Sequence, residues 1–267
     1  MPFRLQPGYE LHARTGTVTV RARTITDIGR DMRTDTLDLE ATVIELRPTC
    51  LVTAMASVIV LAMTVATGSA QVPGGCETLV SARASASDIG CFLAAVEPLG
   101  VIGKASVSWH LYTYPTRTAA EAARGPHGTV VESFGTVWLY TIAEPNWRSS
   151  TGKRVAVIGP LLIDGGKPYT ARYMEAVFPA GMGTPVHHHS GPEAWYVLSG
   201  AQCLETPDKI YVLRAGHGGL VPQGPLMRLS SVGTETRRSV LLVLHDTTQQ
   251  WMTDDTSWTP KNLCPTK

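Results

Sequence analysis

The sequence predicts an all-β protein built as an antiparallel sandwich or barrel. Short apolar stretches of strand length follow one another from residue 129 to residue 246, and every gap between them contains Gly, Pro, Asp or Lys. No helical stretch separates these segments, so a parallel sheet built from alternating strands and helices is not expected. The chain also carries 25 glycines and 18 prolines among 267 residues, a content that favours turns over helices.

Composition divides the chain into five stretches. Residues 1–50 form a leader that is expected to carry no function, and residues 51–70 form one uncharged apolar run. Residues 71–150 form an N-terminal segment of mixed, partly helical character that either extends the later sheets or forms a small subdomain. Residues 151–250 hold the barrel, and residues 251–267 form a polar strap across its outside.

Helices are expected only in the N-terminal segment. One is expected at 88–95, with Ser87 or Asp88 as its N-cap, and another at 116–125, ending at Gly125. All other expected elements are strands, identified from alternating or continuous apolar patterns between turn residues. They lie at 106–114, 129–143 with a turn near Gly135, 154–163, 169–178, 193–205, 209–216, 225–232 and 237–246.

Composition and charge narrow the classes of function. Hydrophobic residues make up 43% of the chain and charged residues 17%, so a large core is expected and disorder is not. The formal net charge is +1 and no basic stripe is present. A nucleic-acid partner is therefore not expected, because proteins that bind nucleic acids carry a positively charged binding surface. The expected ligand is a small molecule.

The apolar run has the features of a secretory signal. Residues 51–70 carry no charge, follow Arg47 and end on small residues, which predicts cleavage after Ala70 and export to the periplasm or outside the cell. The run is also long enough to cross a bilayer, so an uncleaved membrane anchor is the alternative, and a buried helix is a third. The leader before it is either cytoplasmic or the product of an early start, with translation beginning at Met32 or Met55.

Four cysteines follow the apolar run: Cys76, Cys91, Cys203 and Cys264. An even number in an exported chain permits two disulfides, with three possible pairings. We expect Cys203 to pair with Cys264, which would tie the strap to the barrel, and Cys76 to pair with Cys91. Free buried thiols are the alternative.

Three consecutive histidines and a nearby glutamate form the candidate site. In a strand, alternate side chains share a face, so His187 and His189 point one way and His188 points the other. Residues 190–192 can turn the chain, and Glu193 then faces the same interior. Two imidazoles and one carboxylate suit a divalent metal, Fe, Mn, Zn, Ni or Co, and leave coordination positions open. The alternative is a solvated His-rich turn.

The spacing around these residues resembles the first conserved motif of the cupin superfamily. Gly181, five residues, His187, one residue, His189, three residues, Glu193, six residues and Gly200 fill every position of that motif. The resemblance is to cupin-2-like barrels of exported bacterial type. It implies an antiparallel jelly-roll barrel whose metal ligands point into its mouth, and it covers residues 181–231 most strongly.

The second cupin motif is only half kept. Gly216, Pro222 and Gly224 sit at its spacings, but Met227 stands where the family has its fourth ligand, a histidine, and Ser231 stands in place of an asparagine. Three alternatives follow. The site keeps three ligands, or the metal site is degenerate, or the site is completed in another way. In the last case Met227 joins the histidines to hold copper, because a thioether suits Cu(I), or another residue replaces the lost ligand.

Neighbouring residues receive roles from strand parity and position. Trp195 and Val197 share the inward parity of Glu193 and are expected to line the pocket. His217 and His245 lie in a turn and at a strand end, so both are expected at the surface or the rim.

The resemblance implies a range of activities rather than one. Members of the superfamily include dioxygenases, isomerases, decarboxylases, storage proteins and sugar-binding regulators, and some pair into homodimers through barrel edges. The expected function is a metal-dependent oxygenase or isomerase acting on a small organic substrate, and the alternative is a non-catalytic ligand-binding or structural barrel. No G-x-S-x-G sequence supports a hydrolytic triad. The pair Arg237 and Arg238 is expected to be a solvated strand end.

Overall fold

The computed structural model of this chain describes residues 13–14, 17–18 and 76–265. The chain divides into two compact units, residues 1–64 and 65–267. In the first, β1 (Ala13–Arg14) pairs antiparallel with β2 (Thr17–Val18). The expected signal or anchor at 51–70 lies outside the described residues. Among those that are described, no helix is long and apolar enough to cross a membrane.

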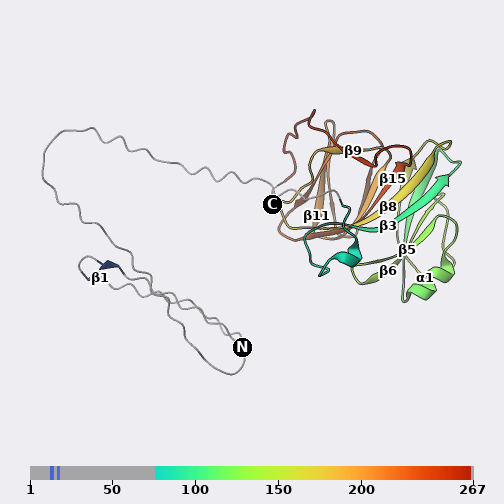
Figure 1. The fold of residues 1–267 in the computed structure, drawn as a ribbon, viewed down its shortest axis with the longest axis horizontal. Coiled ribbons are helices and arrows are strands. Elements are labelled where there is room, and N and C mark those ends of the chain that lie inside the picture. Colours follow the sequence, from blue (N-terminus) through green and yellow to red (C-terminus); the bar gives the residue numbers. More distant parts are fainter. Residues whose placement is uncertain (1–12, 15–16, 19–75, 266–267) are drawn as a thin grey trace, which may run out of the picture. The chain divides into compact units, whose positions relative to one another are not determined.

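Residues 76–265 form three layers of antiparallel strands (Figure 1). The strand orders are β5-β6-β4-β7 in the first layer, β13-β10-β15-β8-β3 in the middle layer and β12-β11-β14 in the third, with a separate β16-β9 pair. The elements are η1 Val80–Ala82, β3 Gly90–Val101, β4 Ser106–Tyr114, α1 Arg117–Ala123, β5 Gly128–Ser133, β6 Thr136–Ala143, β7 Lys153–Leu162, β8 Pro168–Phe178, β9 His187–His189, β10 Glu193–Ser199, β11 Ala201–Glu205, β12 Ile210–Arg214, β13 Gly218–Val221, β14 Arg228–Val232, β15 Arg237–Asp246 and β16 Met252–Asp254.

The middle sheet is buried on both faces, which accounts for its continuous apolar sequences. On β15, Val240, Leu242 and Leu244 pack toward the β5-β6-β4-β7 sheet, whereas Leu241 and Val243 pack toward β11 and β14. A strand covered on one side only would alternate apolar and polar residues, so the unbroken run in β15 follows from its central position. The expected all-β architecture of antiparallel strands is confirmed, and the middle sheet is covered by another sheet on each face.

The N-terminal segment is part of these sheets. β3 pairs with β8 from Gly90 opposite Val177 to Val101 opposite Pro168, and β4 pairs with β7. The strand pairing therefore crosses the boundary expected at residue 150. The helix expected at 88–95 is wrong, because this stretch enters β3 and gains a complete strand partner, which outweighs the helix propensity of its alanines.

The second expected helix is confirmed. It runs as α1 from Arg117 to Ala123, and the hydroxyl of Thr116 accepts a hydrogen bond from the amide of Ala119 at its start. Asp88, expected to cap a helix, instead accepts hydrogen bonds from the amides of Ala84 and Ser85 in the turn before β3.

The strand expected at 193–205 is two strands in different sheets. The first strand ends before Gly200, whose φ is +69°. This glycine separates β10 from β11. A Cβ at this position would also lie 3.0 Å from the backbone of Arg237, so both the turn and the close approach call for glycine. Two short strands, β13 and β16, were not expected from the sequence. The first contains Gly218 and Gly219 and has little side-chain pattern.

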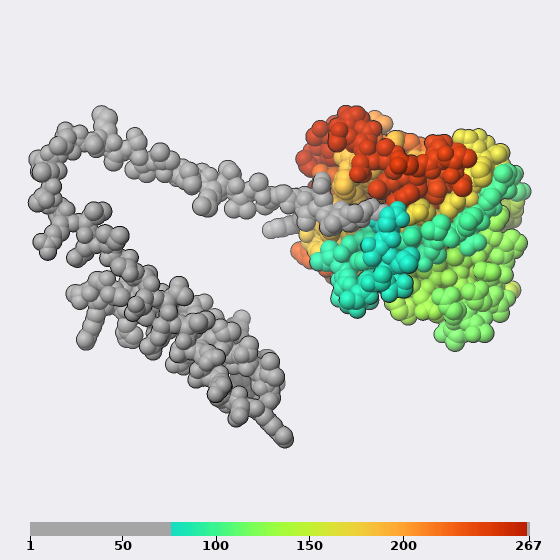
Figure 2. Space-filling model, viewed as in Figure 1, coloured from blue at the N-terminus to red at the C-terminus, as the bar shows by residue number. Residues whose placement is uncertain are grey.

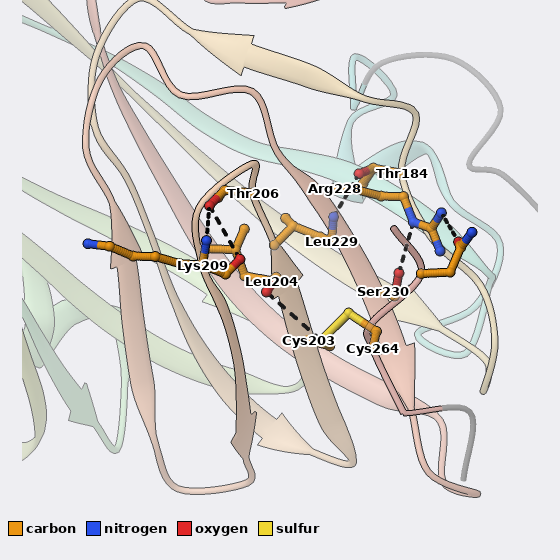
Figure 3. The surroundings of a disulfide bond; sticks show 10 residues. Thr184, Cys203, Leu204, Thr206, Lys209, Arg228, Leu229, Ser230 and Cys264 are labelled. Carbon is orange, nitrogen blue, oxygen red and sulfur yellow. Dashed lines mark hydrogen bonds between the residues drawn. A yellow bond between two sulfur atoms is a disulfide. The ribbon is translucent and has the colours of Figure 1, made fainter. Parts of the chain in front are cut away.

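Both expected disulfides are confirmed. Cys76 bonds to Cys91 on β3, and Cys203 on β11 bonds to Cys264 in the C-terminal strap. Figure 3 shows the second bridge beneath Leu204, with Arg228 nearby on β14. Arg228 also donates to the side-chain oxygen of Asn262, 2.9 Å away, so both contacts hold the end of the strap. Two disulfides are typical of proteins that fold in an oxidising compartment.

Candidate metal centre in the barrel

The loop before the histidines lies along β14. Gly181, at φ +83°, donates its amide to the carbonyl of Ser231, and Thr184 donates to the carbonyl of Leu229. The hydroxyl of Thr184 accepts the amide of Leu229 in return. These bonds guide the chain toward β9 and explain why a glycine opens the motif, since the positive φ disfavours other residues.

Two of the three histidines point into the barrel. β9 pairs with β16, and its alternation buries His187 and His189 on one face while His188 is half-exposed on the other. The side chains of His187 and His189 meet edge to face, with ring centroids 5.0 Å apart. The expected split of the histidine stretch by strand parity is therefore found in the structure.

Glu193 reaches the same space from the first position of β10. The turn before it runs through Gly191, and a Cβ on Gly191 would overlap the carbonyl of Leu244 on β15. Glycine thus lets the turn pass tightly over the middle sheet, so that β10 begins at Glu193. The carboxylate is 2% exposed. One ligand atom from each of His187, His189 and Glu193 lies within 4.8 Å of the others.

Backbone carbonyls set the tautomers of both imidazoles. The Nδ1 of His187 lies 2.9 Å from the carbonyl oxygen of Pro185, and the Nδ1 of His189 lies 2.8 Å from that of Trp251. A carbonyl can only accept, so each Nδ1 carries a hydrogen and each Nε2 keeps its lone pair free for a metal. Burial, followed by the proximity of His189, lowers the pKa of His187, which favours the neutral ligand form.

The donor set fits a divalent cation. Oε2 of Glu193 is buried without a hydrogen-bond partner among the described residues, and it lies 3.3 Å from Nε2 of His189. Burial of an unpaired carboxylate is costly, and a metal ion at this position would remove that cost. Two neutral imidazoles and one carboxylate are borderline and hard ligands of the kind that Fe, Mn, Zn and Ni accept.

Met227 lies beside His187. The two residues exchange backbone hydrogen bonds of 3.1 and 2.9 Å, so the position that holds a histidine in the cupin motif is next to the ligand cluster here too. The Met227 side chain is 1% exposed and packs in the barrel core.

Trp195 and Val197 lie deeper in the barrel. Both are fully buried, and Trp195 stacks on Tyr211 with ring centroids 6.1 Å apart. Their strand parity predicts the inner face, and both belong to the core cluster on that face. The described residues that line the cavity include neither of them, although both are expected to line the pocket.

A cavity of about 170 Å³ opens beside the three ligands. This is on the order of a cavity that holds a benzene-sized molecule. Most of the wall is apolar. The described residues that line it are Cys76, Cys91, Met174, Ala176, Phe178, Thr184, Pro185, His187, His189, Glu193, Leu229, Arg237, Leu241, Val243, Trp251, Met252 and Asp254.

The strap contributes to the mouth of this cavity. Trp251 stacks on His189, with centroids 5.5 Å apart, and its Nε1 donates to the carboxylate of Glu77 over 3.0 Å. Arg172 pairs with Glu77 at 2.8 Å and lies over the Trp251 ring at 4.6 Å. Figure 2 shows the C-terminal residues in red along the upper part of the molecule in that view.

Two expectations about the rim need correction, and a third is confirmed. His217 is exposed, as expected, but His245 is 8% exposed, because it sits inside β15 opposite Thr170. Arg237 was expected to be solvated with Arg238, and it is 1% exposed. The parity of β15 was the missed signal, since Arg237 shares a face with Leu241 and Val243.

Trp251 is a further residue whose role sequence reasoning missed. It lies in a polar stretch, and its contacts arise from folding of the strap over β9, which leaves no periodic pattern.

Comparison with known proteins adds structural likeness at low identity. No protein-family model matches the chain, and no curated protein matches it. Among solved structures, a cupin-like protein from Thermotoga maritima is 18% identical, covers 33% of this chain and 67% of its own, and gives a TM-score of 0.31. A cupin superfamily protein from Desulfitobacterium hafniense is 14% identical, with coverages of 32% and 74% and a TM-score of 0.27. An oxalate oxidase is 21% identical, with coverages of 32% and 45% and a TM-score of 0.26.

Proposed function

We propose that this cupin-type barrel binds one divalent metal ion through Nε2 of His187, Nε2 of His189 and the carboxylate of Glu193. One observation carries the proposal: two buried imidazoles, each with Nδ1 engaged by a carbonyl, surround a buried carboxylate oxygen that lacks a hydrogen-bond partner among the described residues. Iron, manganese, zinc and nickel suit this donor set, and copper becomes the choice if Met227 is a ligand.

We propose further that the site acts on a small organic molecule as an oxygenase or isomerase. A bound metal of this kind supplies Lewis acidity or an oxygen-binding centre. The chain itself contributes orientation and a dry environment. The carbonyls of Pro185 and Trp251 hold the two imidazoles in one tautomer, while the apolar wall and the Trp251 ring limit the access of water.

The first test is the metal content of the full-length protein, purified without a histidine tag and measured by elemental mass spectrometry. We expect about one equivalent in the wild type and a loss of metal in His187→Ala and in His189→Ala. His188→Ala is the matched control, because this histidine lies on the same strand but on the opposite face. Metal content unchanged by His187→Ala would contradict the assignment. Copper that is lost in Met227→Leu would make Met227 a ligand.

A non-catalytic barrel is the second candidate. The replacement of the usual fourth histidine by Met227, whose side chain packs in the core, favours this alternative. In that case the cavity holds a small organic ligand or serves only structure. The melting temperature of the protein would then be unaffected by added Fe, Mn, Zn, Ni or Cu, whereas a metal-binding barrel is stabilised by its ion.

Export is also part of this proposal. The two disulfides support it, because such bonds persist in oxidising compartments. Mass spectrometry of the protein recovered from its source would give a mature N-terminus at Gln71 if residues 51–70 are a cleaved signal. Recovery of the intact chain in the membrane fraction would support the anchor instead.

A further inference from the structure

The cavity contains a positive charge in addition to the metal ligands. Arg237 is the first residue of β15, and its side chain lines the same cavity as His187, His189 and Glu193. Its guanidinium carbon lies 4.2 Å from the ring centroid of Phe178, which also lines the cavity. The close approach of Gly200 to the Arg237 backbone fixes where this side chain begins.

The guanidinium lacks its usual partners among the described residues. Its Nε and Nη1 are buried without a hydrogen-bond partner, and no carboxylate in the described part of the chain forms a salt bridge with it. The ring of Phe178 offers a cation–π contact, which is weaker than a paired carboxylate and supplies no acceptor. A buried arginine with free donors therefore has capacity for one more ligand.

The charge of Arg237 persists at neutral pH. Burial lowers its pKa to about 9, and attraction to Glu193 opposes that shift. When Glu193 binds a metal ion, its negative charge is taken up by the ion, and the interior of the cavity becomes positive. Asp254 lines the mouth but is exposed, so solvent screens its charge. The buried part of the cavity is then suited to bind an anion.

The wall between the charged groups indicates what else the anion carries. Most of its apolar lining consists of methionine, alanine, phenylalanine, leucine and valine side chains, which suit carbon atoms better than a fully hydrated ion. A planar guanidinium matches a carboxylate with two parallel hydrogen bonds.

We propose that the cavity takes a small organic carboxylate and that Arg237 is the residue that binds its carboxylate group. This proposal rests on the proposed metal site, because it concerns the substrate class of the same cavity. The remaining atoms of the ligand occupy the apolar space toward the metal ligands.

The test is calorimetric titration of the full-length protein loaded with Mn(II), whose metal content is measured in every sample. Malonate, succinate and benzoate are the probes, malonamide and benzamide are the uncharged controls, and inorganic phosphate tests for a simple anion site. We expect carboxylates to bind more tightly than their amides. We expect Arg237→Met to weaken carboxylate binding about 10- to 100-fold, as loss of a charged hydrogen-bond pair does. Arg237→Lys should bind carboxylates more tightly than Arg237→Met, because lysine keeps the positive charge but cannot form the two parallel hydrogen bonds of a guanidinium.

Arg238→Met is the matched control, since Arg238 is the exposed neighbour on the same strand and should leave binding unchanged. Thermal unfolding shows whether each variant is folded, and Arg237→Lys carries the test if Arg237→Met is not. Carboxylate binding that is unaffected by either Arg237 variant would overturn the proposal. So would phosphate binding tighter than that of every carboxylate, or no carboxylate binding at all.

The two proposals can fail separately. If the wild type retains no metal, the proposed metal function fails, and the same titration of metal-free protein still measures whether carboxylates depend on Arg237. If metal is retained in Arg237→Met and in the wild type alike but carboxylate binding does not differ, the metal site stands and the role of Arg237 does not.

Discussion

Trp251 contacts the imidazole of His189 twice, through its backbone carbonyl and through its indole ring. The imidazole Nδ1 donates to the Trp251 carbonyl over 2.8 Å, and the two rings stack at an interplanar angle of 15°. One residue of the C-terminal strap therefore sets the tautomer of a candidate metal ligand and also covers it. The strap is thus part of the site, although 62 residues of sequence separate the two.

Replacement of Trp251 by alanine should separate these two contributions. The backbone carbonyl remains, so His189 keeps its tautomer and the metal content should stay near that of the wild type. The loss of the ring contacts with His189 and Arg172 should lower the free energy of unfolding by about 1–2 kcal/mol. Urea unfolding measures this change, with Trp258→Ala, a second half-buried tryptophan of the strap, as the control. Equal effects of both variants would show that the contact with His189 is not special.

His110 should make the stability of the protein depend on pH. Its side chain is fully buried, its Nε2 donates to the carbonyl of Glu144 over 2.9 Å, and burial lowers its pKa. A histidine with a folded-state pKa below its unfolded value of about 6.5 takes up protons on unfolding between those two values. Its contribution to stability is therefore complete above about pH 6.5 and is lost as the pH falls through the folded pKa.

The measurement is the melting temperature of metal-free protein between pH 8 and pH 5, compared with that of His110→Gln. The variant should show a shallower fall below about pH 6.5, because it cannot be protonated. His217→Gln is the control, since His217 is exposed. Identical slopes in the wild type and in His110→Gln would rule out this histidine as a source of the dependence.

The candidate metal ligands could be predicted from sequence because the strand period is local. Once residues 187–189 are a strand, their parity follows, and one turn brings Glu193 to the same face. Both disulfide pairings were also expected. Strand parity alone could not predict which residues of the inner face reach the cavity. Trp195 lies on that face, yet it stacks on Tyr211 and does not line the cavity.

The missed features depend on long-range packing. Residues 88–95 have an alanine-containing sequence that is compatible with a helix. They form a strand instead because they pair with β8. Arg237 looked solvated beside Arg238 because a burial pattern is hard to read at the end of a strand. Trp251 acquires its role only when the strap returns to β9, and no local pattern records that return.

Removal of the two disulfides should have unequal costs. The Cys203–Cys264 bridge spans 61 residues and the Cys76–Cys91 bridge spans 15. In the chain-entropy description, these loops correspond to about 4 and about 3 kcal/mol respectively. We therefore expect the double serine variant at 203 and 264 to lose more unfolding free energy than the one at 76 and 91. Urea unfolding of the two variants measures the difference, and the reverse order would mean that strain or cavity packing outweighs loop entropy.

Gly191 offers the sharpest test of how the turn positions Glu193. An alanine there would press its methyl group into the carbonyl of Leu244, so the turn at residues 190–192 and β15 would have to move apart. Overpacking of this kind costs about 1–3 kcal/mol, and the movement would carry Glu193 away from His187 and His189. Gly191→Ala should therefore lower both the unfolding free energy and the metal content. Gly125→Ala is the control, because a Cβ at Gly125 meets no atom within 4 Å. Full metal content together with an unchanged melting temperature in Gly191→Ala would show that the turn adapts without disturbing the ligand.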